Sequence, residues 1–304
     1  MRYFPVVLAL VLGTGCASTL SSMQTAKPLE RGQFQVSLGA GLFVPVGPIA
    51  TVADFGIRES DKFLALINGG ERVELSQEDQ RRLLTAGLAL GVAPPGMVTE
   101  IMARAGVAEN LDMGLRYSGI SLRLDAKYRF LHRGSGEDGP RSGRSSFDMA
   151  IGLGLARHNF KSPALDLLKL VDIDDFSRYD VEVPFYVSSE AGEVLKLYAG
   201  PKYVYSRTRL DQKLVDYSQQ GKDVAGFDVS LPSRVNSHFV GSTLGIALGY
   251  KYVHLYAELT GGYTFCKPSV FGEKRNLGGP TFYPALGIGF RNGEPERAAR
   301  RSQR

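Results

Sequence analysis

Apolar and polar side chains alternate along much of this chain, and the alternation predicts β-strands. In ISLRLDAKYRF, residues 120–130, one parity holds Leu122, Leu124, Ala126, Tyr128 and Phe130, and the other holds Arg123, Asp125, Lys127 and Arg129. Successive side chains of a strand point to opposite faces, so this segment has one apolar face and one largely charged face. A soluble protein would bury the apolar face, whereas a membrane barrel would turn it toward lipid.

The same period of two recurs in ten segments. They are 33–46, 98–107, 111–118, 120–131, 146–158, 179–189, 194–206, 238–250, 254–266 and 281–290. Alternate connections are short or moderate, as at 108–110 and 132–144, while most of the others are long, as at 47–97 and 267–280. This asymmetry is typical of transmembrane barrels, whose short turns face the periplasm. We predict an all-β fold: a transmembrane antiparallel up-and-down β-barrel of about ten strands.

The first long connection has helical character. Ser76 is suited to cap a helix, good helix formers follow it, and Pro94-Pro95 ends the pattern, which predicts a helix over 77–91. Residues 61–68 suggest a shorter helical turn, so we expect a small helical insert at about 50–95 in the first outer loop. Residues 207–237 either extend the flanking strands beyond the membrane or contain a further hairpin.

The volume of the barrel decides which face lies inside. The apolar parity supplies about five large side chains per strand, and an eight-stranded barrel is already filled by its inward side chains. The polar parity consists of small residues and charges that nearly cancel, and buried charges must be paired. We therefore predict a lumen charge network of Glu100, Arg104, Asp112, Arg116, Arg123, Asp125, Lys127, Arg129, Asp148, Glu182, Lys196, Lys202 and Glu258. Aromatic residues near the strand ends on the apolar parity would form interfacial girdles.

The N-terminus is typical of a secreted protein. Arg2 is followed by an apolar run from Phe4 to Leu12, then by Gly13-Thr14-Gly15 and Cys16, which predicts a signal peptide over 1–15. A cysteine after small residues at this point resembles the lipobox of bacterial lipoproteins. The resemblance implies that Cys16 is lipidated and becomes the mature N-terminus, anchored on the periplasmic side and followed by a periplasmic segment over 16–32. The alternative is ordinary signal cleavage with Cys16 incidental.

Charge and cysteine content narrow the classes of protein. The formal net charge is +5, but residues 291–304 alone carry five arginines against two glutamates, so most of the excess lies in this basic tail, which we expect to be disordered. No nucleic-acid-binding motif accompanies it, and we expect no nucleic-acid partner. Cys266 is the only other cysteine, so no intramolecular disulfide is expected if Cys16 is acylated.

Few residues suggest catalysis, a metal or a cofactor, and we expect none of the three. The four histidines are His132, His158, His238 and His254. Only His158 and His238 lie near the expected outer rim, and neither has an adjacent Asp or a His-x-Ser pattern. The acidic run at 172–175 lacks the spacing of a calcium loop.

The last predicted strand adds a resemblance. In TFYPALGIGF, Phe282, Leu286, Ile288 and Phe290 resemble the terminal signal by which outer-membrane barrels are recognised by the barrel-assembly machinery. Residues 107–118 and 195–206 are similar to hairpin and strand sequences of small Gram-negative outer-membrane barrel proteins, particularly a lipidated, uncharacterised group. The resemblance covers nearly all of 33–290. It implies the outer membrane as location, membrane lipid as surroundings and the assembly machinery as a partner during insertion.

Three functions remain open on this evidence. The first is a structural or interaction component of the cell envelope, without catalysis, which meets an envelope protein partner through its outer loops. The second is a narrow, porin-like channel for small solutes. The third is an outer-membrane hydrolase that uses His158 or His238. A soluble lipocalin-like barrel is the rival fold, and it would have an apolar lumen.

Overall fold

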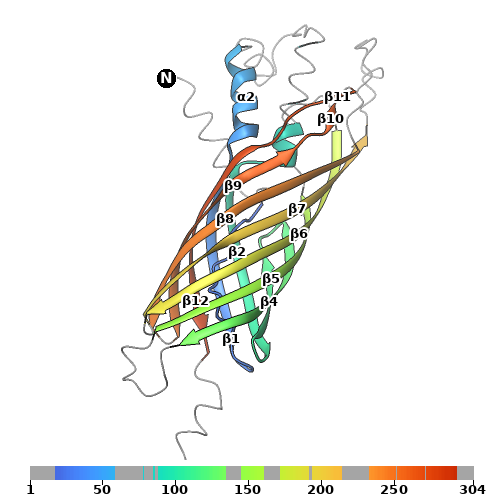
Figure 1. The fold of residues 1–304 in the computed structure, drawn as a ribbon. Helices are drawn as coiled ribbons and strands as arrows, with labels where there is room; N and C mark the ends of the chain where they lie inside the picture. The colour runs from blue at the N-terminus through green and yellow to red at the C-terminus, as the bar shows by residue number, and fades with distance from the viewer. Residues whose placement is uncertain are drawn as a thin grey trace, which may run out of the picture.

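The protein is a closed barrel of ten antiparallel strands (Figure 1). The computed structural model describes residues 18–58, 78, 85, 88–134, 145–160, 172–191, 194–213, 233–250, 252–270 and 272–292. The barrel strands are β1 (Phe34–Pro45), β2 (Gly96–Ala108), β3 (Leu111–Tyr117), β4 (Ser121–Gly134), β5 (Ser145–Phe160), β6 (Asp172–Ala191), β7 (Leu195–Lys213), β8 (Arg234–Tyr250), β9 (Val253–Cys266) and β12 (Gly279–Arg291). All ten predicted strands are present, and the predicted fold class is confirmed.

The two ends of the barrel differ. The end that carries the connections after β2, β4, β6 and β8, together with the start of β1 and the end of β12, is called the hairpin end. The opposite end is called the loop end, and it carries α2 and the small sheet of β10 (Ser269–Val270) and β11 (Glu273–Lys274) (Figure 1). Pairing of β1 with both β12 and β2 closes the sheet, so no strand edge is left open.

The exposed face of the barrel is apolar. On β4, Leu122 and Leu124 are 53% and 50% exposed, whereas Arg123 between them is 4% exposed. The charges therefore face the lumen and the leucines face outward, as the sequence predicted. Such a surface is suited to lipid and not to water, because apolar side chains are stable against lipid tails. Lipid cannot form hydrogen bonds with the backbone, and the closed barrel meets this requirement by pairing its backbone groups between strands.

Helix α2 (Val46–Arg58) differs from the sequence expectation. It begins directly after β1, earlier than the predicted insert, because Pro48 lies in its first turn, where proline is tolerated. Residues 78, 85 and 88–92 are helical and fall in or beside the predicted helix, whereas 61–68 lie outside the described residues.

Among the described residues, no helix is long and apolar enough to cross a membrane.

Strands β6, β7 and β8 extend further toward the loop end than predicted. β7 continues to Lys213 and β8 starts at Arg234, so the extension of the flanking strands at 207–237 is confirmed for the described residues. Pairs such as Arg209 with Arg234 continue the sheet there.

The N-terminal segment lies inside the barrel. Residues 18–31, here called the strap, enter the lumen near the loop end and reach the hairpin end, where a turn closed by Gln33 N donating to Glu30 O at 2.8 Å leads into β1. Gly32 has φ +85°, a conformation that glycine adopts without steric cost. The sequence predicted a periplasmic segment over 16–32; residues 18–31 instead lie in the lumen, whose polar groups bind them. Residues 1–17 and the tail beyond 292 lie outside the described residues.

A charged substitution on the exposed face tests the membrane assignment. Leu244 on β8 is 65% exposed and lies six residues from Tyr250 at the hairpin end and six from His238 near the loop end. We expect Leu244→Arg to lower the free energy of unfolding in lipid vesicles by about 2–4 kcal/mol, measured by denaturant titration. The matched variant Val253→Arg, at the hairpin end, should cost about 0–1 kcal/mol. Equal costs at both positions would contradict a lipid-facing band.

Candidate functional site

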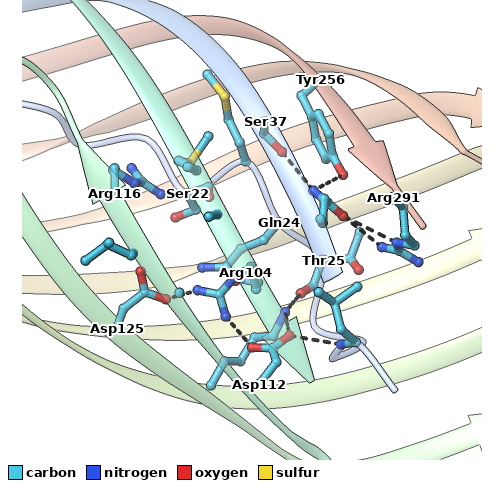
Figure 2. A pocket seen from close by; sticks show the side chains of 18 of the residues that line it. Ser22, Gln24, Thr25, Ser37, Arg104, Asp112, Arg116, Asp125, Tyr256 and Arg291 are labelled. Atoms are coloured by element: carbon cyan, nitrogen blue, oxygen red, sulfur yellow. Dashed lines mark hydrogen bonds and ion pairs between the residues drawn. The ribbon is translucent and has the colours of Figure 1, made fainter. Parts of the chain in front are cut away.

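The lumen holds the candidate site, and its charges form connected ion pairs. Arg104 of β2 reaches both Asp112 of β3 and Asp125 of β4, as Figure 2 shows. Lys127 Nζ lies 3.3 Å from the second oxygen of Asp112. Arg104 crosses over Gly114 on the strand between, where an added Cβ would lie 2.8 Å from the guanidinium. A glycine on the inward parity thus lets an ion pair bridge two strands that are not neighbours.

A second ion pair crosses over an inward glycine farther along the barrel. Arg123 of β4 pairs with Glu182 of β6 across Gly154 of β5, whose Cβ would lie 2.9 Å from the guanidinium. Lys202 of β7 lies 3.5 Å from the other oxygen of Glu182. These contacts connect four consecutive strands from the inside, so the pairs stiffen the barrel wall as well as neutralise the lumen.

The remaining predicted charges also point inward, with two kinds of partner. Arg116 lies 3.2 Å from Glu100, Arg129 lies 3.0 Å from Asp148, and Lys196 lies 3.5 Å from Glu190, which the sequence analysis did not single out. Glu258 differs, because its partners among the described residues are neutral hydrogen-bond donors: Ser22 N, Met23 N, the Tyr198 hydroxyl and the Thr260 hydroxyl.

Glu258 holds the strap through its main chain. Its two carboxylate oxygens accept the consecutive N–H groups of Ser22 and Met23, each at 2.7 Å. Met23 has φ +45°, which is uncommon for a residue with a side chain. Consecutive N–H groups that bind one anion form a concave anion site. The carboxylate of the wall is the anion here.

Other wall residues contact strap main-chain atoms in the same way. Ser188 Oγ accepts from Ala26 N and Asp112 Oδ2 accepts from Leu29 N, both at 3.0 Å. Donors of the wall reach the strap carbonyls: Arg116 to Ser21 at 2.6 Å and Ser22 at 3.1 Å, Lys127 to Thr25 at 2.7 Å, and Lys202 to Leu20. The predicted charge network therefore has a second role, which is to bind a polypeptide.

Four apolar side chains of the strap are buried three residues apart. They are Leu20, Met23, Ala26 and Leu29, each at most 4% exposed. Met23 fits between inward glycines: an added Cβ on Gly287 would lie 2.5 Å from its sulfur, and one on Gly39 would lie 2.8 Å from it. This spacing of three was the sequence signal that could have separated the strap from an ordinary linker. The strand period of two does not detect it.

Two small cavities lie beside the strap among the described residues. One cavity of about 30 Å³ borders Arg104, Gln35 and Arg291 (Figure 2), and another of about 30 Å³ lies near Ser18 and Cys266 at the loop end. Each has room for only a few water molecules. Gln35 connects Tyr256 and Arg291: its Nε2 donates to the tyrosine hydroxyl at 3.1 Å, and its Oε1 accepts from Arg291 Nη2 at 3.1 Å.

The histidines occupy different environments. His158 is buried, and its Nε2 lies 2.8 Å from Asp180, which also accepts from Arg178 Nε at 2.6 Å. This Asp–His pair was not visible in the sequence, because its members come from two strands. The nearby hydroxyls of Ser18 and Ser206 are bound by Arg178 and not by His158, so the group is an ion-pair cluster that holds the strap end.

His238 is exposed on the outer face of β8, beside Tyr203 and Tyr205 of β7. Its Nδ1 is 2.8 Å from the Tyr203 hydroxyl, and the Tyr205 ring lies 5.2 Å away between centroids. At the hairpin end, His132 lies 2.7 Å from Asp148, and His254 is buried in the lumen. Among the described residues, no group of three or more His, Cys, Asp or Glu side chains could hold a metal ion.

Phe290 and Cys16 are the two other predicted sites. Phe290 is 47% exposed on the outer face of β12, opposite Val36 and Val253. Cys16 falls outside the described residues.

Comparison with known proteins gives structural likenesses only. No protein-family model and no curated protein matches the chain. The Neisserial surface protein A structure is 12% identical, with a TM-score of 0.33, and covers 86% of this chain and 96% of its own. Ail of Yersinia pestis is 8% identical with a TM-score of 0.31, and the match covers 86% of this chain and 99% of Ail. OprG of Pseudomonas aeruginosa is also 8% identical with a TM-score of 0.31, and the match covers 89% of this chain and 100% of OprG. These likenesses are too distant to transfer a property, so the fold class rests on strand pairing and the apolar exterior.

Removing one charge from the wall tests the binding of the strap. In Glu258→Gln, the amide group retains one acceptor oxygen and places a donor where the second strap N–H needs an acceptor. We expect the free energy of unfolding to fall by about 1–3 kcal/mol, because one buried N–H loses its partner. Glu273→Gln is the matched control, since Glu273 forms an exposed ion pair with Arg275 and surface pairs contribute little. Equal effects of the two substitutions would contradict the assigned role of Glu258.

Proposed function

We propose that this protein is a closed outer-membrane β-barrel of the Gram-negative cell envelope, which acts as a structural or interaction component without catalysis. The observation that carries the proposal is the occupied lumen: the strap fills the space that a channel would need, and its polar groups are bound by the wall. A narrow channel requires a continuous aqueous path, and cavities of about 30 Å³ beside the strap do not supply one.

The membrane location is supported by the surface. A closed barrel with outward leucines, aromatic residues near the strand ends and short connections at one end has the features of outer-membrane barrels. We assign the hairpin end to the periplasm and the loop end to the cell surface on the same grounds. Barrel assembly would then use the outward Phe290 signal of β12, and Cys16 would carry the lipid of a lipoprotein.

The loop end is the surface proposed for an envelope partner. Helix α2 stands on this end of the barrel beside β12 (Figure 1), and Ala50 and Ala53 are exposed on it. The ion pairs of the wall keep the strands that carry these elements in fixed positions. A rigid barrel that projects a helix and extended strands is suited to contact another macromolecule.

Conductance distinguishes the closed barrel from the channel. We expect purified full-length protein to give no current steps in planar lipid bilayers, because the strap occupies the lumen. Gly287→Leu should produce steps, since its side chain would take the space of Met23 and displace the strap. Heat-modifiable gel migration would verify that both proteins are folded. Steps from the wild-type protein would refute the closed barrel and favour the narrow channel.

Site-specific crosslinking tests the partner surface. A photo-crosslinking residue at Ala53 on α2 should yield a defined protein adduct in intact cells. The same residue at Arg133, which is exposed at the hairpin end, is the matched control and should not yield that adduct. If neither position, nor others on the loop end, gives an adduct with an envelope protein, the interaction role is wrong.

A further inference from the structure

The strap crosses the lumen in a defined direction. At the loop end, Arg178 Nη1 donates to Ser18 Oγ at 2.6 Å, beside a cavity lined by Pro45 of β1 and Cys266 of β9. At the hairpin end, Asp112 at the start of β3 binds Leu29 N. The chain therefore passes from one end of the barrel to the other before it turns back into β1.

The strap follows the centre of the lumen and not the edge of one strand. Its contacts come from different sides of the wall: Leu20 from Lys202 on β7, Met23 from Glu258 on β9, and Ser21 and Ser22 from Arg116 on β3. Among the residues that the structure describes, no strand forms a ladder of backbone hydrogen bonds with residues 18–29. Long side chains reach inward from all around and replace such a ladder.

The wall binds polar side chains of the strap, such as the Thr19 hydroxyl at Glu100, and it also binds the strap through its main chain. The wall contacts four N–H groups, those of residues 22, 23, 26 and 29, and five carbonyls, those of residues 20, 21, 22, 25 and 27. Carboxylates and a hydroxyl face the N–H groups, whereas arginine and lysine face the carbonyls. Main-chain groups are common to every polypeptide, so this arrangement recognises an extended chain as such.

We propose that the lumen is a binding site for a single extended polypeptide, occupied by the strap, and that through it the barrel delivers the chain ahead of Ser18 to the loop end. This inference rests on the proposed outer-membrane location. The start of β1 and the end of β12 lie at the hairpin end, so the strap is the part of the described chain that returns through the membrane inside the barrel.

The path has a consequence for the lipid anchor. Cys16 precedes Ser18 by two residues, which span at most about 7 Å of extended chain. On this path, an acyl group on Cys16 would be nearer to the cell-surface leaflet than to the periplasmic one. The proposal therefore differs from the sequence expectation of an anchor on the periplasmic side.

Surface labelling of intact cells tests the path. A short epitope inserted between Ala17 and Ser18 should be labelled by antibody in intact cells, to a level similar to that of an epitope inserted in the loop-end connection at 214–232. An epitope in the hairpin-end connection at 135–144 should be labelled only after the outer membrane is permeabilised. Labelling of the first epitope only after permeabilisation would overturn the proposal.

The loop-end control distinguishes an error in the orientation of the barrel from an error in the path of the strap. If the epitope at 214–232 is itself hidden in intact cells while the one at 135–144 is labelled, the assumed orientation fails, and the proposed function fails with it. If the loop-end control is labelled and the epitope ahead of Ser18 is not, the orientation stands and only the path of the strap is wrong.

A disulfide in purified full-length protein tests the strap without any assumption about the membrane. Ala26 N donates to Ser188 Oγ at 3.0 Å, so Ala26→Cys with Ser188→Cys should form a link between residues 26 and 188, detected by mass spectrometry of the digest. Ala26→Cys with Thr208→Cys, whose second position lies near the loop end, should not form the link. A link at neither position, or equally at both, would show that the strap does not hold this register.

Discussion

Pairing of buried charges inside a narrow closed sheet is the constraint on which this structure depends. Lipid outside the barrel accepts leucine and aromatic side chains, so every polar side chain on the other parity must find its partner within the lumen. The partners are not always on neighbouring strands. Gly114 and Gly154 lie beneath Arg104 and Arg123 and let these guanidinium groups reach carboxylates two strands away.

The strap completes this pairing. Glu258 has no basic partner among the described ion pairs of the wall. The consecutive N–H groups of Ser22 and Met23 donate hydrogen bonds to its carboxylate instead. Arg116, Lys127 and Lys202 divide their hydrogen bonds between carboxylates of the wall and carbonyls of the strap. The strap is thus part of the polar interior and not a tail that happens to rest there.

This arrangement links the interior to function. A lumen filled by polypeptide and bound by charge pairs favours a barrel that presents surfaces over one that conducts solutes. The His158–Asp180 pair, which taken alone suggests catalysis, is held with Arg178 at the point where the strap begins, and the two nearby hydroxyls are bound by the arginine. The same cluster fixes the end of the strap at the loop end, where α2 and the long strands are gathered.

The sequence by itself determined the ten strands, their parity and the inward set of charges, because a period of two is local information. It also contained the terminal pattern around Phe290. It did not place a helix directly after β1, because its helical signals, Ser76 and Pro94-Pro95, lie farther along the chain. Nor did it reveal the strap, whose apolar residues recur every three positions and whose partners lie far away in the chain. Only the tertiary structure decided which charge meets which, and that the N-terminal segment lies inside. Both depend on where closure of the sheet places side chains from distant strands, and no local pattern records that.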